Sequence, residues 1–288
     1  MSAISQKKSN VIRAIFGCEK AIIGVVHCPP LPGSPRNKDI DFKLTLKKAF
    51  DDARAYADGG VDGLIIENHG DIPFLKPQDI GPETSASLAV IVDRIAQSLN
   101  LPLGVNVLAN AVIPALAIAK AGGARFVRVN QWANAYVANE GFVEGDAARA
   151  LRYRAQIGAD DVAIFADAHV KHGAHAITAD RSIAELARDV EFFDADAIIA
   201  TGQRTGDAAT SDEIQAIRSG SSLPLLVGSG VTIDNVATIL PLVDGIIVAS
   251  ALKRDGVWWN EVEKDRVSVL MRKVREIRES GGAGVGVR

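Results

Sequence analysis

The chain has 288 residues, of which 48% are hydrophobic and 23% are charged, and its formal net charge is -3. This is the composition of an ordinary folded protein, and it excludes the strongly basic surface by which proteins bind nucleic acid. No apolar run reaches the roughly 18 to 20 residues of a membrane-spanning helix, so no integral membrane segment is expected.

The beginning of the chain predicts a cytoplasmic protein. Residues 1–10 are polar, and the apolar stretch VIRAIF that follows is interrupted by Arg13 and is too short for the core of a secretory signal. The two cysteines, Cys18 and Cys28, are too few for a disulfide framework, which agrees with a reducing compartment.

Eight short apolar runs predict the strands of a parallel sheet. Each is rich in β-branched residues and nearly continuous in apolar character, as expected of strands that are buried on both faces. In chain order the runs are AIIGVVH (21–27), DGLIIEN (62–68), LPLGVNV (101–107), RFVRVN (125–130), DVAIFAD (161–167), DAIIATG (196–202), LPLLVG (223–228) and DGIIVAS (244–250).

Amphipathic stretches between these runs predict helices, so the chain alternates strand and helix from end to end. The alternation predicts one domain, a (β/α)8 TIM barrel over residues 1–279, since such barrels usually have about 250 residues. The glycine-rich end, residues 280–288, predicts a flexible tail. An open doubly wound sheet is the competing fold, but for a nucleotide it would carry a glycine-rich motif after its first strand, where this chain has HCPPLPGSPR.

Polar residues close nearly all of the predicted strands. The carboxyl ends of the strands of a TIM barrel meet at one mouth, so these residues predict a functional site there. They are His27, Glu67, Asn68, Asn106, Arg128, Asn130, Asp167, His169, Thr201, Gly228, Ser229 and Ser250.

The stretch VGSGVTIDNV at the seventh predicted strand predicts a phosphate site. Glycines let an anion approach the backbone closely, and a helix N-terminus offers N–H groups and a partial positive charge. Gly228, Ser229 and Gly230 follow this strand, Thr232 is placed to cap the next helix, and Ser250 follows the eighth strand. Barrels frequently bind phosphate at these two loops, although a tight turn without a ligand would need the same glycines.

Carboxylates and histidines at the strand ends predict acid/base chemistry. Glu67 closes an apolar strand, where partial desolvation would raise its pKa toward the range of a general acid or base. A salt bridge from Glu67 to Arg128 is the alternative. Asp167 is predicted to be the second proton-transfer group, and His27 and His169 are predicted to polarise the substrate or relay a proton.

Further polar groups predict contacts to a substrate. Lys171 is expected to hold an anionic group, and Arg204 lies in a glycine-containing loop that could close over a ligand. The other predicted substrate contacts are Asn106, Arg128, Asn130 and Thr201.

The segment DAHVKHGAH raises the question of a metal. Its histidines, His169, His172 and His175, are spaced by three residues, and imidazole is a common zinc ligand. Because they lie in a loop, and because no HxH pair ends the first strand, neither a metal nor another cofactor is predicted. A Schiff-base aldolase is disfavoured as well, since the sixth strand ends in Thr201 rather than lysine.

Four segments, GVVHCPPLPGSPR, DGLIIENHGDIPF, VRVNQW and VGSGVTIDNV, resemble the BtpA/SgcQ family of TIM-barrel proteins, and the similarity covers about residues 12–279. The resemblance implies a barrel, in agreement with the strand count. For function, the resemblance implies two alternatives, a role in photosystem I biogenesis and a role in sugar utilisation. A weaker similarity, to the phosphate-binding barrels of the tryptophan synthase alpha and indole-glycerol phosphate group, rests on Glu67, on GSGV and on ASAL after the eighth strand.

The leading hypothesis is therefore an enzyme that acts on a small phosphorylated metabolite, a phosphosugar, by acid/base chemistry of the isomerase or lyase type. The alternative is a non-catalytic assembly or stability factor, such as a photosystem I biogenesis protein. Both are compatible with a homo-oligomer, whose symmetry the sequence does not indicate.

Overall fold

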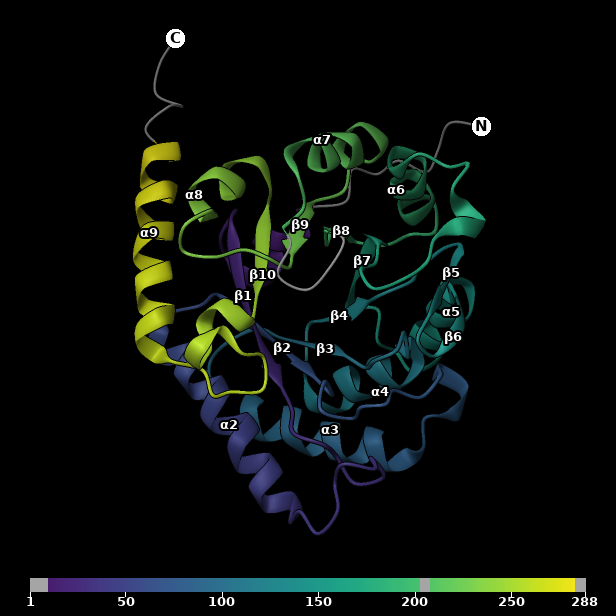
Figure 1. Cartoon of the computed structure of the whole chain (residues 1–288), viewed down its shortest axis with the longest axis vertical. Helices are drawn as coiled ribbons and strands as arrows, with labels where there is room; N and C mark the ends of the chain where they lie inside the picture. The colour runs from purple at the N-terminus through teal and green to yellow at the C-terminus, as the bar shows by residue number, and fades with distance from the viewer. Residues whose placement is uncertain (1–9, 203–207, 283–288) are drawn as a thin grey trace.

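The computed structural model of the chain describes residues 10–202 and 208–282, and Figure 1 shows its helices arranged around a central barrel of strands. Eight parallel strands close on themselves in the order β1-β10-β9-β8-β7-β4-β3-β2, which confirms the predicted fold class. Their bounds are β1 Ala21–His27, β2 Gly63–Glu67, β3 Leu103–Asn106, β4 Phe126–Val129, β7 Ala163–His169, β8 Ala197–Ala200, β9 Leu225–Gly228 and β10 Gly245–Val248.

Helices cover the outside of the barrel, as the amphipathic stretches predict. The α-helices are α1 Val11–Phe16, α2 Phe42–Gly59, α3 Pro82–Ala96, α4 Val112–Gly122, α5 Ala147–Gln156, α6 Ile183–Phe192, α7 Ser211–Gly220, α8 Val236–Ile239 and α9 Lys264–Gly282. The last helix takes in the first three residues of the predicted tail, and residues 283–288 lie outside the described residues. Among the described residues, no helix has the length and apolar character needed to span a membrane.

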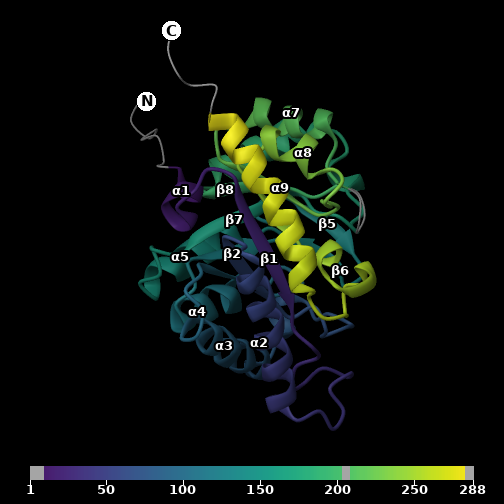
Figure 2. The same ribbon diagram turned by 90° about the vertical axis from the view of Figure 1, so that its left-hand side faces the viewer.

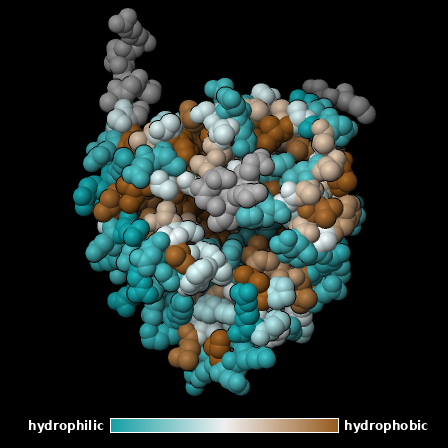
Figure 3. Space-filling view, in the orientation of Figure 1, coloured by the Kyte–Doolittle hydropathy of each residue, from teal (hydrophilic) through white to brown (hydrophobic). Residues whose placement is uncertain are grey.

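The outer surface matches this arrangement. Figure 3, in the orientation of Figure 1, shows many hydrophilic residues over this face of the molecule, with hydrophobic residues scattered among them in small groups. Contacts between α2 and α9 and between α3 and α4 bury the apolar faces of neighbouring helices. The apolar layer between strands and helices is therefore continuous around the barrel.

A second apolar cluster fills the barrel interior, and the short helix α1 closes its amino-terminal end. The ring of Phe16 packs edge-on against Phe126 with centroids 5.6 Å apart, and Phe126 stacks on Phe165 at 4.6 Å. Ile12 is fully buried in the same cluster. The apolar stretch before β1 thus plugs one end of the barrel, and within the described part of the chain the central cavity lies at the carboxyl end of the strands.

A two-stranded hairpin follows β4 and lies near the open end. Its strands, β5 Ala135–Ala138 and β6 Gly141–Glu144, pair antiparallel, and a further bridge joins Val137 to Ala174 in the loop after β7. Figure 2 shows α1 and this hairpin on opposite sides of the barrel. The hairpin brings Tyr136 to the mouth, where its side chain is buried.

The plug makes a prediction about stability. Ile12→Ala leaves a cavity in the barrel floor and is expected to lower the free energy of unfolding by about 2–5 kcal/mol in urea titrations. Leu44→Ala is the control, because Leu44 is 62% exposed and its truncation should change stability by no more than about 0.5 kcal/mol. Equal effects of the two substitutions would contradict the assignment of α1 as the plug.

Candidate active site

Strand register brings the first predicted site residues together. In the pairing of β1 with β2, His27 lies opposite Glu67, and in the pairing of β2 with β3, Glu67 lies opposite Asn106. Each residue is the last of its strand, so all three side chains stand at the same level of the mouth. Their alignment follows from the parallel ladder alone.

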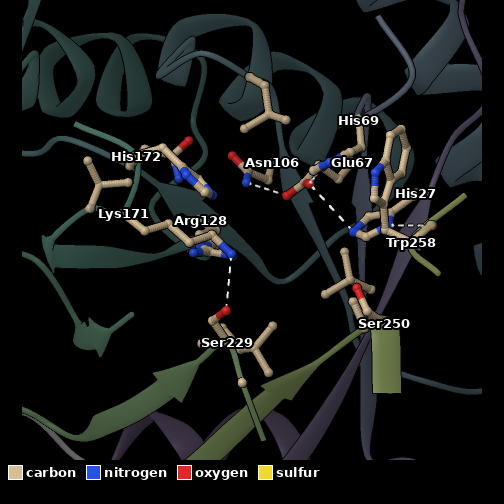
Figure 4. Close-up of a pocket in the computed structure, with 18 of the residues that line it drawn as sticks. His27, Glu67, His69, Asn106, Arg128, Lys171, His172, Ser229, Ser250 and Trp258 are labelled. Atoms are coloured by element: carbon tan, nitrogen blue, oxygen red, sulfur yellow. Dashed lines mark hydrogen bonds and ion pairs between the residues drawn. The ribbon is translucent and has the colours of Figure 1, made fainter. Parts of the chain in front are cut away.

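These residues line a cavity of about 650 Å3 at the carboxyl end of the barrel (Figure 4). This volume is that of a site for a small-molecule ligand. The predicted site residues that line it are His27, Glu67, Asn106, Arg128, Asn130, Lys171, Gly228, Ser229, Gly230 and Ser250.

One wall of the cavity is an imidazole and carboxylate cluster. Glu67 Oε1 accepts a hydrogen bond of 2.7 Å from His69 Nδ1 and lies 3.8 Å from His27 Nε2, while Glu67 Oε2 accepts one of 2.6 Å from Asn106 Nδ2. The two imidazole rings stack with centroids 4.3 Å apart, and the indole of Trp258 packs against both. The ligand atoms of His27, Glu67 and His69 all lie within 4.8 Å of one another, so these three residues could hold a metal ion.

The hydrogen bonds of the cluster define its protonation states. The carbonyl oxygen of Trp258 can only accept, so His27 donates to it from Nδ1 over 3.1 Å and the neutral ring keeps a lone pair on Nε2. Burial, together with the neighbouring His69, lowers the pKa of His27 to about 3. Burial alone would raise the pKa of Glu67, but the hydrogen bond from His69 and the nearby guanidinium of Arg128 bring it below its usual range. Glu67 is therefore a carboxylate at neutral pH, and the expectation from the sequence that its pKa is raised is wrong, because the hydrogen bond from His69 and the charge of Arg128 together outweigh desolvation.

A buried ion pair occupies the centre of the barrel mouth. Arg128 Nε and Nη2 donate to the two carboxylate oxygens of Asp167, each over 3.1 Å, and Asn130 Nδ2 donates to Asp167 over 3.2 Å. The Arg128 guanidinium reaches toward β9, where its Nη2 lies 3.7 Å from the position that a Cβ on Gly228 would take. Asp167 thus holds Arg128 and does not itself line the cavity, and the alternative pairing of Arg128 with Glu67 is not formed.

The opposite wall carries the predicted phosphate loop and a lysine. Lys171 Nζ donates to Ser229 Oγ over 3.2 Å, an interaction drawn in Figure 4. Burial, with the nearby Arg128, lowers the pKa of Lys171. Gly230 has a φ of +66°, a conformation that glycine adopts without strain. Ser250, which opens a 3₁₀ turn after β10, completes this wall.

The loop after β9 differs from the prediction in one respect. Thr232 does not cap the next helix, because α8 begins only at Val236 and has four residues. Instead, Thr232 Oγ1 accepts from the N–H of Asp234, and Asn235 Nδ2 donates to the carbonyl of Gly230. The loop is held by side-chain hydrogen bonds, and any anion would meet loop N–H groups rather than a long helix.

Three further predicted residues, Asn68, His169 and Thr201, do not line this cavity. Asn68 is buried, and its Oδ1 accepts from the N–H of Leu108 over 2.8 Å. His169 stacks on His175 with centroids 3.7 Å apart and faces a second cavity, where burial and His175 lower its pKa to about 4. Thr201, which follows the last residue of β8, is fully buried, and its hydroxyl donates to the carbonyl oxygen of His169 over 2.8 Å. Arg204 falls in 203–207, outside the described residues.

Two residues of the site were not predicted from sequence. His69 follows Glu67 by two residues, and the period of two in extended chain was a signal that both face the same way. Trp258 comes from the loop before α9, and no pattern in the sequence places it over the histidines. Asp71, four residues after Glu67, accepts from the Leu31 N–H over 2.7 Å and from Asn68 over 3.1 Å.

The buried pair predicts a structural effect of Asp167. Asp167→Ala leaves the Arg128 charge buried without its partner and is expected to cost about 3–5 kcal/mol in the free energy of unfolding. The double variant Arg128→Met with Asp167→Leu should recover most of that loss. Asp161→Ala is the control, since the Lys120 and Asp161 pair is exposed and its loss should cost at most about 1 kcal/mol in the same urea titrations. A fully stable Asp167→Ala protein would contradict this role.

Comparison with other proteins gives a family and a fold. The model of the BtpA family matches residues 18–276. A protein of Archaeoglobus fulgidus is 42% identical over 257 residues, covering 89% of this chain and 99% of the relative. The Photosystem I biogenesis protein BtpA of Synechocystis is 37% identical over 262 residues, covering 91% of this chain and 90% of the relative.

Solved structures with a similar fold include two barrels at low sequence identity. Thiamine phosphate pyrophosphorylase from Pyrococcus furiosus has a TM-score of 0.54 and 16% identity, covering 90% of this chain and 97% of the other. Phosphoribosyl anthranilate isomerase from Thermus thermophilus has a TM-score of 0.54 and 11% identity, covering 89% and 99%. At such identities the likeness shows the fold alone.

Proposed function

The chain belongs to the BtpA family, and we propose that it is an enzyme that acts on a small phosphorylated metabolite, a phosphosugar, by acid/base chemistry of the isomerase or lyase type. The observation that carries this proposal is the polarity of the cavity. One wall presents the ammonium group of Lys171 beside the loop of Ser229, and the other presents the carboxylate of Glu67. A substrate with an anionic end and a neutral polyhydroxyl end would match both.

The phosphate is proposed to bind at the lysine wall. Gly228 and Gly230 have no side chain to keep an anion away from the loop backbone, and Ser229 and Ser250 add hydroxyl donors. Lys171 contributes a positive charge, which is attractive to phosphate in a partly buried cavity where water screens little. These groups bind and orient the substrate but do not take part in proton transfer.

The proton transfer is proposed to occur at the imidazole wall. Glu67 is held by Asn106 and His69, so its carboxylate is positioned before the substrate arrives. It would remove a proton from a carbon next to a carbonyl, and an amide N–H of Asn106 or Asn130 would donate to the developing oxyanion. His27 gives its Nδ1–H to Trp258, so its Nε2 lone pair could only accept a proton in a relay. The Oδ1 atoms of Asn106 and Asn130 are buried with no protein partner among the described residues, so both can accept a bond from a substrate hydroxyl.

The names of the similar barrels agree with a phosphorylated ligand. Thiamine phosphate pyrophosphorylase and phosphoribosyl anthranilate isomerase both carry a phosphate compound in their names. Because their identity to this chain is low, these names show only that barrels of this fold can act on phosphate compounds, and the proposal for this chain rests on its cavity.

Phosphate binding is tested by thermal unfolding with inorganic phosphate and a panel of sugar phosphates. A ligand at about 100 times its dissociation constant should stabilise the protein by about 2.7 kcal/mol. Lys171→Met should weaken binding at least tenfold, or about 1.4 kcal/mol, because it removes the charge that faces the phosphate. Lys43→Met, on the exposed surface of α2, is the matched control and should bind like the wild type. If no phosphate compound stabilises the protein, the phosphate site is refuted.

Proton transfer is tested by hydrogen exchange in D2O, followed by NMR. The protein should introduce deuterium at a carbon of the phosphosugar that stabilises it, because the carboxylate exchanges the removed proton with solvent. Glu67→Gln should slow this incorporation by about 10²–10⁴-fold while leaving the thermal shift with inorganic phosphate intact. A Glu67→Gln protein that exchanges hydrogen at the wild-type rate would contradict the role of Glu67.

A second candidate is suggested by the name of the Synechocystis relative, a photosystem I biogenesis protein that is 37% identical to this chain. In that case the barrel would serve as an assembly or stability factor and its cavity would at most sense a ligand. Binding of a phosphosugar without any hydrogen exchange, or no binding at all, would favour this candidate over the enzyme.

A further inference from the structure

We propose that His27, Glu67 and His69 form a binding site for one divalent transition-metal ion of the zinc class, with its open coordination position facing the cavity. The sequence predicts no metal, because the histidines after β7 lie in a loop and no HxH pair ends the first strand. Two imidazole nitrogens and one carboxylate are ligands that zinc prefers, and three protein ligands with one open position are typical of catalytic zinc sites.

The distances in the cluster suit a shared ion. Two ligands bonded at about 2.0–2.1 Å to a tetrahedral zinc ion lie about 3.3 Å apart. His27 Nε2 and Glu67 Oε1 are 3.8 Å apart, too far for a hydrogen bond but close to that spacing, and all three ligand atoms lie within 4.8 Å of one another. Among the described residues, no other group of three histidine, cysteine or acidic side chains comes this close.

The surrounding contacts orient the ligands as they do in metal sites. A ligating histidine commonly donates its second N–H to a carbonyl, and His27 does so from Nδ1 to Trp258, which points the Nε2 lone pair toward Glu67. Glu67 uses Oε2 to accept from Asn106, leaving Oε1 for the ion. In the structure His69 Nδ1 donates to this Oε1. Ligation through Nδ1 requires only that the ring proton move to Nε2 and that the 2.7 Å contact open slightly.

The burial of the cluster favours tight binding of an ion over the weak binding that exposed surface residues provide. The side chains of His27 and Glu67 are 8% and 6% exposed, whereas that of His69 is 30% exposed. Trp258 covers the two rings from the side, so the remaining approach is through the cavity. A ligand in the cavity would therefore meet the ion directly.

Without an ion, Glu67 is the proton acceptor of the proposed reaction. With an ion bound, Glu67 would instead be a ligand, and the ion would supply a Lewis acid or a bound hydroxide in its place. The phosphate wall is formed by other residues, so the inference does not depend on phosphate binding. Thermal shifts with inorganic phosphate in the presence of a chelator test that wall alone, and metal titrations without phosphate test the cluster alone. Failure of one proposal is thus distinguishable from failure of the other.

The experiment is a calorimetric titration of the chelator-treated full chain with Zn2+, and with Co2+ as an optical probe. The wild type should bind one equivalent and give the visible absorption of Co2+ held by imidazole nitrogen. Glu67→Gln and His69→Gln should weaken binding more than the roughly 10- to 100-fold expected for Asn106→Ala, which removes only a group that holds Glu67. Thermal unfolding without metal shows whether each variant is folded.

The second histidine cluster supplies the matched control. His169→Gln with His175→Gln removes two stacked imidazoles that lie at the other cavity, and it should leave the stoichiometry and the Co2+ spectrum unchanged. Three results would overturn the proposal: no binding by the wild type, unchanged binding by a folded His69→Gln protein, or loss of binding in the control.

Discussion

The parallel pairing of neighbouring strands is the constraint on which the site depends. Because each of β1, β2 and β3 ends at the same level, His27, Glu67 and Asn106 arrive side by side from three separate segments of the chain. A slip of one residue in either ladder would turn the side chains of that strand to the other face of the sheet and disperse the cluster. The apolar cluster under α1 packs the interior of the same strands at their other end. The same strands therefore carry the apolar packing of the barrel floor at one end and the site residues of the mouth at the other.

The Arg128 and Asp167 pair explains how a guanidinium can lie in the centre of the barrel. Desolvation of two buried charges offsets most of their attraction, so such a pair adds little net stability, yet loss of either partner leaves an uncompensated charge. Asp167 cancels the charge of Arg128 and, with Asn130, determines its orientation. The pair adds directed N–H groups beside Gly228 without adding much net charge. The contrast in charge across the cavity consequently depends on Lys171 and Glu67.

Sequence patterns predicted the barrel and most of the mouth because both follow from regular backbone geometry. Continuous apolar runs indicate buried parallel strands. A polar residue or a glycine at the carboxyl end of such a strand is expected at the mouth of the barrel, as Glu67 and Gly228 are. The sequence did not predict the direction in which some side chains point or the residues that they contact. His169 closes β7 and Thr201 follows β8, yet both lie outside the cavity, and the pairing of β7 with β8 is irregular between Asp167 and His169. Trp258 reaches the site through a loop, whose path no periodicity describes.

The two walls of the cavity impose a direction on any anionic ligand. The carboxylate of Glu67 repels a phosphate, while Lys171 attracts it, so an ionised end is favoured at the loop of Ser229 and a neutral end is favoured at the imidazoles. Since both charges lie in a partly buried space, the difference between the two orientations is larger than it would be in water. A divalent ion on the imidazole wall would reverse the sign of that wall and make it a second site for oxygen atoms of the ligand. The charge state of the cluster around Glu67 would then determine whether the cavity holds a substrate by one end or by both.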